Sequence, residues 1–118
     1  MPTVVIVDDH QSFRRFARRL LEEAGLTVVG EAADGASALA EVRVHNPDVV
    51  LLDVVLPDTS GLAVAEQLAL EPHRPLVVVT SSRSRSDFGA GLDSPAIDAV
   101  IAKHELTGAA IAAVAGAR

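Results

Sequence analysis

The sequence predicts an α/β domain whose parallel sheet is covered by helices on both faces. Five apolar runs of strand length alternate with segments of helical character, and the connections between them are short. The chain has 118 residues, 49% of them hydrophobic, which is enough for one core and too apolar for a disordered chain. We therefore expect a single domain over residues 1–118, with right-handed crossovers and without a repeat or linker.

The first part of the chain predicts a strand, a helix and a second strand. Thr3–Val7 is a continuous apolar run, which is typical of a strand buried on both faces. A helix is expected over about Ser12–Ala24, where apolar residues recur at helical spacing and arginine and glutamate fill the other face. Phe13 and Phe16 belong to the apolar stripe, so we expect both in the core. The second strand is expected over Thr27–Ala32.

The middle of the chain predicts a helix, a strand and another helix. Asp34 can cap a helix that runs to about Val44, where Asn46-Pro47 stops it. The third strand is expected over Val49–Leu52. After a loop from Pro57, a third helix is expected over Gly61–Leu70 and is stopped by Pro72.

The last part of the chain contains the weakest helical signal. The fourth strand is expected over Leu76–Val79 and the fifth over Ala99–Ala102. Between them, glycine residues in and beside the segment Asp87–Leu92 limit the fourth helix to about that range. An alanine-rich helix is expected from about Leu106 to Ala115.

Composition excludes several classes of function. The net charge is −6, which argues against a nucleic-acid surface on this domain. The chain has no cysteine, so it has neither disulfides nor thiolate chemistry, as is common in a reducing cytoplasm. The N-terminus lacks the pattern of a signal peptide, and no apolar run reaches the ~18 residues of a membrane span. We expect a cytoplasmic location.

Charged and polar residues follow the apolar runs, at the carboxyl ends of the expected strands, where parallel sheets place their functional residues. Asp8 and Asp9 close the first run, Asp53 the third, Thr80 the fourth and Lys103 the fifth. Side chains at the carboxyl ends of parallel strands converge at one edge of the sheet. Three carboxylates in one place repel each other unless a cation joins them, and Mg²⁺ prefers carboxylates, water and phosphate oxygens. The sequence therefore predicts a site for a divalent cation and a phosphoryl group.

Asp53 is the best candidate for a carboxylate that accepts a phosphoryl group. In the expected strand order, 2-1-3-4-5, it ends the central strand, and the other residues of the site flank it. Lys103 can bind phosphate as a point charge, and the hydroxyl of Thr80 can donate to a phosphoryl oxygen. Such a set stabilises phosphoryl transfer to a carboxylate, a known nucleophile for this step.

The pattern resembles the receiver domain of bacterial two-component response regulators, and the resemblance covers the whole chain. The matching segments are IVDDH, LLDVVLPDTSG with Asp53, VVVTSS with Thr80, and IAKHEL with Lys103. Pro57 and Gly61 lie in the loop after Asp53 as in the family. Each segment alone is a weak signal, but all four in this order are specific.

The resemblance implies a flavodoxin-like (βα)₅ fold and a phosphorylation-controlled signalling role. Asp53 would take a phosphoryl group from a histidine kinase, a phosphotransfer protein or a small donor. Mg²⁺ would be held by Asp9 and Asp53, by Asp8 through water, and by the backbone carbonyl of Val55. The domain would catalyse only its own phosphorylation and dephosphorylation, and would control a partner or an output without touching nucleic acid or membrane.

The resemblance also implies a switch, and here the sequence departs from the family. Lys103 would bind the phosphoryl group and Thr80 would follow it after transfer. Family members carry Tyr or Phe where this chain has Val100, and proline where it has His104, for which a trans peptide bond is expected. A homodimer could form through the face of the fourth helix, the fifth strand and the fifth helix. Ser81 is the alternative switch hydroxyl.

Other interpretations of the same residues are weaker. A degenerate receiver that binds partners without phosphorylation is favoured only by Val100. An aspartyl-phosphate hydrolase of the haloacid dehalogenase type needs an Asp where this chain has Val55. A P-loop module would need a GxxxxGK(S/T) segment, which this chain lacks. A flavin-binding module would need Trp or Tyr to stack on the flavin, and the chain has neither. His10 could approach the metal, but an exposed residue at a helix start is the simpler interpretation.

Overall fold

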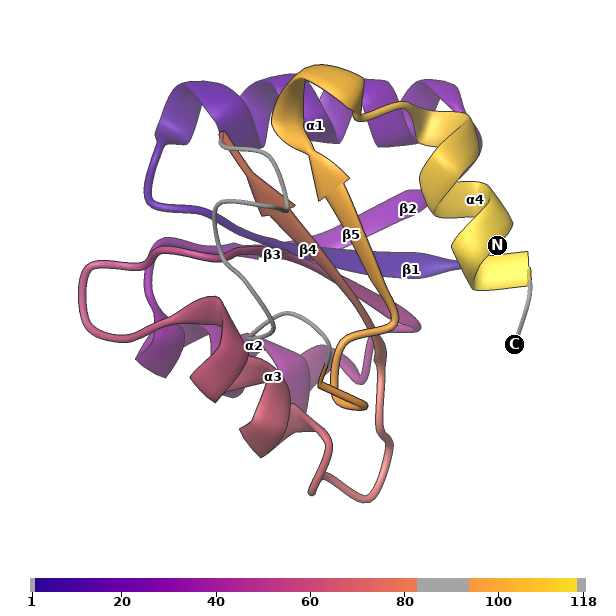
Figure 1. Cartoon of the computed structure of the whole chain (residues 1–118). Coiled ribbons are helices and arrows are strands. Elements are labelled where there is room, and N and C mark those ends of the chain that lie inside the picture. The colour runs from indigo at the N-terminus through magenta and orange to yellow at the C-terminus, as the bar shows by residue number, and fades with distance from the viewer. Residues whose placement is uncertain (1, 83–93, 117–118) are drawn as a thin grey trace.

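The fold is a five-stranded parallel sheet in the order β2-β1-β3-β4-β5, as predicted. A computed structural model describes residues 2–82 and 94–116 (Figure 1). The strands are β1 Thr3–Val7, β2 Thr27–Ala32, β3 Val49–Asp53, β4 Leu76–Ser81 and β5 Ala99–Ala102.

Helices cover both faces of the sheet. α1 and α4 pack on one face, and α2 and α3 pack on the other (Figure 1). The helices are α1 Gln11–Glu23, α2 Gly35–His45, α3 Gly61–Leu68 and α4 Gly108–Gly116, with a short 3₁₀ turn, η2, over Lys103–Glu105. The expected helix Asp87–Leu92 lies outside the described residues.

Two hydrophobic clusters fill the space between the helices and the sheet. Val5, Val50 and Val77 pack toward α2 and α3, whereas Ile6 and Leu51 pack toward α1 and α4. Successive side chains of a strand point to opposite faces, so each buried strand serves both clusters. The prediction that Phe16 lies in the core is wrong, because 50% of this residue is exposed. Phe13 is partly buried against the cluster that lies between the sheet and the helices α1 and α4.

Several element boundaries differ from those expected. β3 continues through Asp53 and β4 through Ser81, because Asp53 pairs with Thr80 and Ser81 with Ala102. The last helix starts at Gly108 rather than near Leu106. The chain first makes the η2 turn, and the Thr107 hydroxyl then accepts a hydrogen bond from the Ala110 N–H at 3.0 Å.

Candidate functional site

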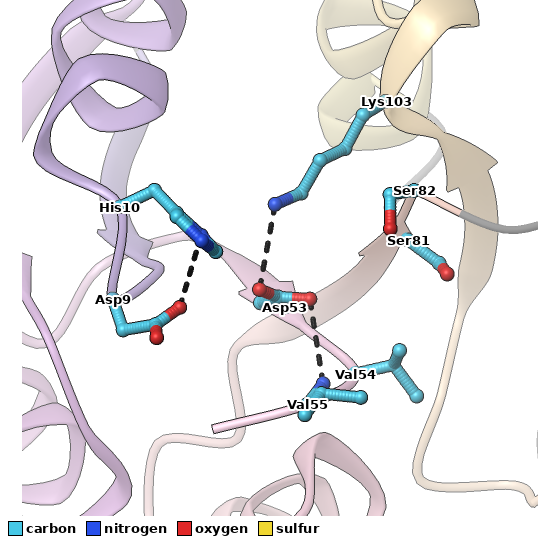
Figure 2. Close-up of a pocket in the computed structure, with 8 residues that line it drawn as sticks. All are labelled: Asp9, His10, Asp53, Val54, Val55, Ser81, Ser82 and Lys103. Atoms are coloured by element: carbon cyan, nitrogen blue, oxygen red, sulfur yellow. Dashed lines mark hydrogen bonds and ion pairs between the residues drawn. The ribbon is translucent and has the colours of Figure 1, made fainter. Parts of the chain in front are cut away.

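Residues at the carboxyl ends of β1, β3, β4 and β5 meet in one pocket at the edge of the sheet (Figure 2). Its volume is about 320 Å³. The residues that line it are Asp9, His10, Asp53, Val54, Val55, Ser81, Ser82 and Lys103. Six of the residues singled out from the sequence therefore line the pocket: Asp9, His10, Asp53, Val55, Ser81 and Lys103. Asp8 and Thr80 are buried beneath its surface.

Strand register explains why the side chains converge. Asp53 follows Leu51 by two positions and Thr80 follows Val78 by two, and both of these hydrophobic residues face α1 and α4. Asp53 and Thr80 are also direct partners across β3 and β4. Because side chains alternate along a strand, Asp53 and Thr80 extend the same hydrophobic rows to the sheet edge.

Asp53 lies at the base of the pocket and is only 5% exposed. One carboxylate oxygen, Oδ1, accepts a hydrogen bond from the backbone N–H of Val55 at 3.3 Å. The other, Oδ2, lies 3.4 Å from Nζ of Lys103. Burial, followed by the nearby charge of Asp8, raises the pKa of Asp53, and the ammonium of Lys103 opposes that rise. The lysine therefore favours the ionised carboxylate.

Lys103 is held in place from three sides. Its Nζ lies 2.6 Å from Oδ2 of Asp8, 3.4 Å from Oδ2 of Asp53 and 4.4 Å from the ring centroid of Phe13. The contact with Asp8 is an ion pair by distance but lacks hydrogen-bond geometry. Phe13, a residue that the sequence assigned only to the core, thus contributes a cation–π contact to the site.

The turn between β1 and α1 arranges the acidic pair. The Oδ1 atom of Asp8 accepts the backbone N–H of His10 at 2.8 Å, and the backbone carbonyl of Asp8 accepts Nη1 of Arg14 at 2.5 Å. His10 is the N-cap of α1 and its side chain is 67% exposed, as expected of a residue at a helix start. However, its Nδ1 lies 3.1 Å from an oxygen of Asp8 and 3.1 Å from an oxygen of Asp9.

The loop after β3 is fastened to the start of α2. Asp58 accepts hydrogen bonds from the backbone N–H groups of Gly35 at 2.8 Å and Ala36 at 3.1 Å. The loop closes where the Gly61 N–H donates to the Val54 carbonyl at 2.8 Å. A Cβ atom at Gly61 would lie 2.4 Å from the Asp53 carbonyl oxygen, so this approach needs glycine. Asp58 therefore helps to position Val55 beside the pocket.

Thr80 is not among the residues that line the pocket. It is 1% exposed, and its hydroxyl has no hydrogen-bond partner. A buried hydroxyl without a partner is costly, which makes it available to a ligand that reaches the site. Ser81, the alternative hydroxyl from the sequence, lines the pocket together with Ser82.

The two family departures are visible in the structure. Val100 pairs with Val79 across β4 and β5. It is partly buried and packs against the cluster between the sheet and the helices α2 and α3. The Lys103–His104 peptide bond is trans, since no cis bond occurs in residues 2–82 and 94–116. His104 is exposed beside Glu105 and lies outside the pocket lining.

The donor atoms at this edge could hold a metal ion. Asp8, Asp9, His10 and Asp53 each offer one ligand atom, and these atoms lie within 4.8 Å of one another. The donors are mostly carboxylate oxygens, which suit hard divalent cations. The fit is supported by the fully buried Asp8, which keeps a carboxylate at this end of the pocket although its Oδ2 atom is ion-paired with Lys103 at 2.6 Å.

The fold and the site together define a response regulator receiver domain. The chain matches the family model of this domain over residues 4–114 and belongs to the family. Its fold aligns with a signal receiver domain from Mycobacterium tuberculosis assigned to the response regulator NarL, with a TM-score of 0.89 and 31% identity, covering 99% of this chain and 98% of that one. A CheY-like receiver domain from Methylobacillus flagellatus aligns with a TM-score of 0.85 and 27% identity, covering 99% and 98%.

Relatives known from their sequences are longer proteins. A protein-glutamate methylesterase/protein-glutamine glutaminase of Hahella chejuensis is 39% identical over 84 residues, which are 71% of this chain and 24% of that protein. The transcriptional regulatory protein PdtaR of Mycobacterium tuberculosis is 35% identical over 82 residues, 70% of this chain and 40% of that protein. The chain thus spans less than half of these relatives. Within its described part, no helix is long and apolar enough to cross a membrane.

Proposed function

We propose that this chain is a phosphorylation-controlled signalling module that accepts a phosphoryl group on Asp53. The observation that carries the proposal is the placement of Asp53 at the base of an open pocket, with Lys103 at 3.4 Å and Asp9 at the rim. The donor would be the phosphohistidine of a sensor kinase or phosphotransfer protein, or a small acyl phosphate. No acid residue stands two positions after Asp53, so an additional hydrolase activity is not proposed.

The ionised carboxylate of Asp53 is the nucleophile. One of its oxygens forms the new bond to phosphorus as the bond from phosphorus to the imidazole nitrogen breaks, and the imidazole leaves with the bonding electron pair. Lys103 stabilises the equatorial oxygens of the transferred group by its charge. Because Asp8 and Asp53 hold the ammonium of Lys103 between them, its positive charge is already in position when the donor binds.

Asp9, Asp53 and the backbone carbonyl of Val55 would hold Mg²⁺, with Asp8 acting through water. The cation would offset the negative charge of the carboxylates and of the incoming phosphoryl group. Asp8 remains paired with Lys103 in this arrangement, and its fixed carboxylate can orient a bound water. Asp58 holds the loop that presents Val55.

After transfer, Lys103 and the Thr80 hydroxyl would both close on the phosphoryl oxygens. The hydroxyl is buried beside Asp53 without a partner, so a new acceptor would satisfy it. Val100 offers no ring that could move between surface and interior. We infer that phosphorylation alone shifts the conformation only in part, and that a partner or a second copy on the face of β5 and α4 completes the shift.

The experiment that tests this function uses beryllofluoride, which stands in for the phosphoryl group, with Mg²⁺ and backbone NMR. Wild-type protein should show shifts around Asp53, Thr80 and Lys103, and the Asp53→Asn variant should show none. The shifts should spread further at high protein concentration than at low concentration. A wild-type protein whose spectrum does not respond to beryllofluoride and Mg²⁺ would contradict the proposed function.

A further inference from the structure

His10 lies where a cation ligand would lie. Its Nδ1 atom is 3.1 Å from Oδ1 of Asp8 and 3.1 Å from Oδ1 of Asp9. Its ring is among the residues that line the pocket, beside Asp9 (Figure 2). Neither the family match nor the relatives assign a ligand role to this residue.

The two separations of His10 Nδ1 from the acidic pair match those of neighbouring ligands on one ion. Neighbouring ligands of an octahedral cation with bonds of about 2.1 Å are about 3.0 Å apart. His10 Nδ1 and Asp9 Oδ1 are 3.1 Å apart, and these atoms, with those of Asp8 and Asp53, fall within 4.8 Å of one another. Asp8 is fully buried, and only one cation, the ammonium of Lys103 at 2.6 Å from Oδ2, offsets the charge of this carboxylate.

We propose that the imidazole of His10 is a direct ligand of the divalent cation in this receiver. The inference rests on the cation site of the proposed function but not on phosphorylation. Oxygen donors suit Mg²⁺, whereas imidazole suits later transition metals such as Co²⁺, Ni²⁺ and Zn²⁺. A site in which an imidazole joins the carboxylates of Asp9 and Asp53 therefore favours Co²⁺ and Zn²⁺ over Mg²⁺ more strongly than a site of oxygen ligands alone.

An ion pair of a protonated His10 with the two carboxylates is the competing arrangement. It has the same two distances but places a proton, rather than a metal, between nitrogen and oxygen. The other histidines of the chain lie apart from this group: His45 pairs with Glu41, His104 lies beside Glu105, and His73 lines a surface hollow with Arg43. A nitrogen ligand at the site would therefore be His10.

Pulsed EPR of the Mn²⁺-loaded protein tests the ligand directly, because an imidazole nitrogen bound to Mn²⁺ modulates the electron spin echo. The nitrogen signal should be present in the wild type and in His73→Ala, a control that removes an exposed histidine elsewhere. It should be lost in His10→Ala, and also in His10→Asn, which places a residue favoured at helix N-caps at this position. A wild-type protein that binds Mn²⁺ without nitrogen coupling would overturn the inference and leave the proposed function standing.

Calorimetry with Co²⁺ and with Mg²⁺ gives the second readout. His10→Ala should weaken Co²⁺ binding by about tenfold or more and Mg²⁺ binding by much less, since imidazole contributes to the softer ion. Equal loss for both cations would also overturn the inference. A wild-type protein that binds neither cation would contradict the proposed function itself, so the two failures are distinguishable.

Discussion

Lys103 lies closer to Asp8 than to Asp53: its Nζ is 2.6 Å from an oxygen of Asp8 and 3.4 Å from an oxygen of Asp53. The fully buried carboxylate of Asp8 therefore has the lysine as its nearest countercharge, while Asp53 keeps one side open to the pocket. The two members of the acidic pair, Asp8 and Asp9, therefore differ in their burial and in their charged partners. Both carboxylates contact His10, but Asp8 is buried and paired with Lys103, whereas Asp9 stands at the rim.

The stability effects of removing Asp8 and Asp9 should have opposite signs in metal-free protein. Asp8→Ala removes the partner of a part-buried lysine and the acceptor of the His10 N–H, and should lower stability by about 1–3 kcal/mol. Asp9→Ala relieves repulsion among the carboxylates and should raise the urea midpoint. Added Mg²⁺ should reduce that advantage, because the cation stabilises the wild-type fold by binding it. A lower midpoint for Asp9→Ala without metal would contradict this account.

Asp53 should make the stability of metal-free protein depend on pH. Burial and Asp8 raise its folded pKa above the ordinary value of 3.8, so the folded state holds the proton more tightly than the unfolded state. Stability should then fall as pH rises from that ordinary value through the raised folded pKa. Asp53→Asn lacks this fall, so its urea midpoint should exceed that of the wild type at neutral pH. The advantage should shrink below the unfolded pKa, and a constant difference across pH would refute the assignment.

Phe13 should act as a positioning residue for Lys103. Its ring centroid lies 4.4 Å from Nζ, a contact worth roughly 0.5–2 kcal/mol depending on exposure. Phe13→Leu should keep most of the hydrophobic packing yet slow phosphorylation by a small-molecule donor severalfold. Phe16→Leu, a change at the half-exposed neighbour, is the matched control and should leave the rate unchanged. If both variants slow the reaction equally, the effect comes from α1 packing and not from the lysine contact.

Asp58 should couple the loop after β3 to the start of α2. Asp58→Ala removes the acceptor of two backbone N–H groups and should cost about 1 kcal/mol, as the loss of a helix cap does. The same change should weaken Mg²⁺ binding, because Val55 is then less well positioned. Asp34→Ala, which removes the other α2 cap, should cost similar stability while sparing Mg²⁺ affinity. If calorimetry shows equal losses of Mg²⁺ affinity in both variants, the affinity depends on the stability of α2 and not on the position of the loop.

The sequence predicted the strands and the convergence of Asp8, Asp9, Asp53 and Lys103, because apolar runs and the polar residues that follow them are local patterns. The strand order is a property of the whole fold, and it was predicted together with the resemblance to receiver domains. It was wrong about Phe16, since helical spacing alone does not say where the buried stripe ends. It could not show that Thr80 stays beneath the pocket or that Asp58 reaches α2, because both depend on register and loop path. The turn-forming residues of the segment PDTSG indicated a loop, but they did not indicate that Asp58 binds the start of α2.

Intact-mass and peptide mass spectrometry after incubation with acetyl phosphate and Mg²⁺ test the central claim most directly. The account predicts a single phosphoryl adduct, on Asp53, that is absent from Asp53→Asn and retained in Asp58→Asn, a control acid in the same loop. Equal labelling of Asp53→Asn, or an adduct on another carboxylate of the wild type, would contradict it.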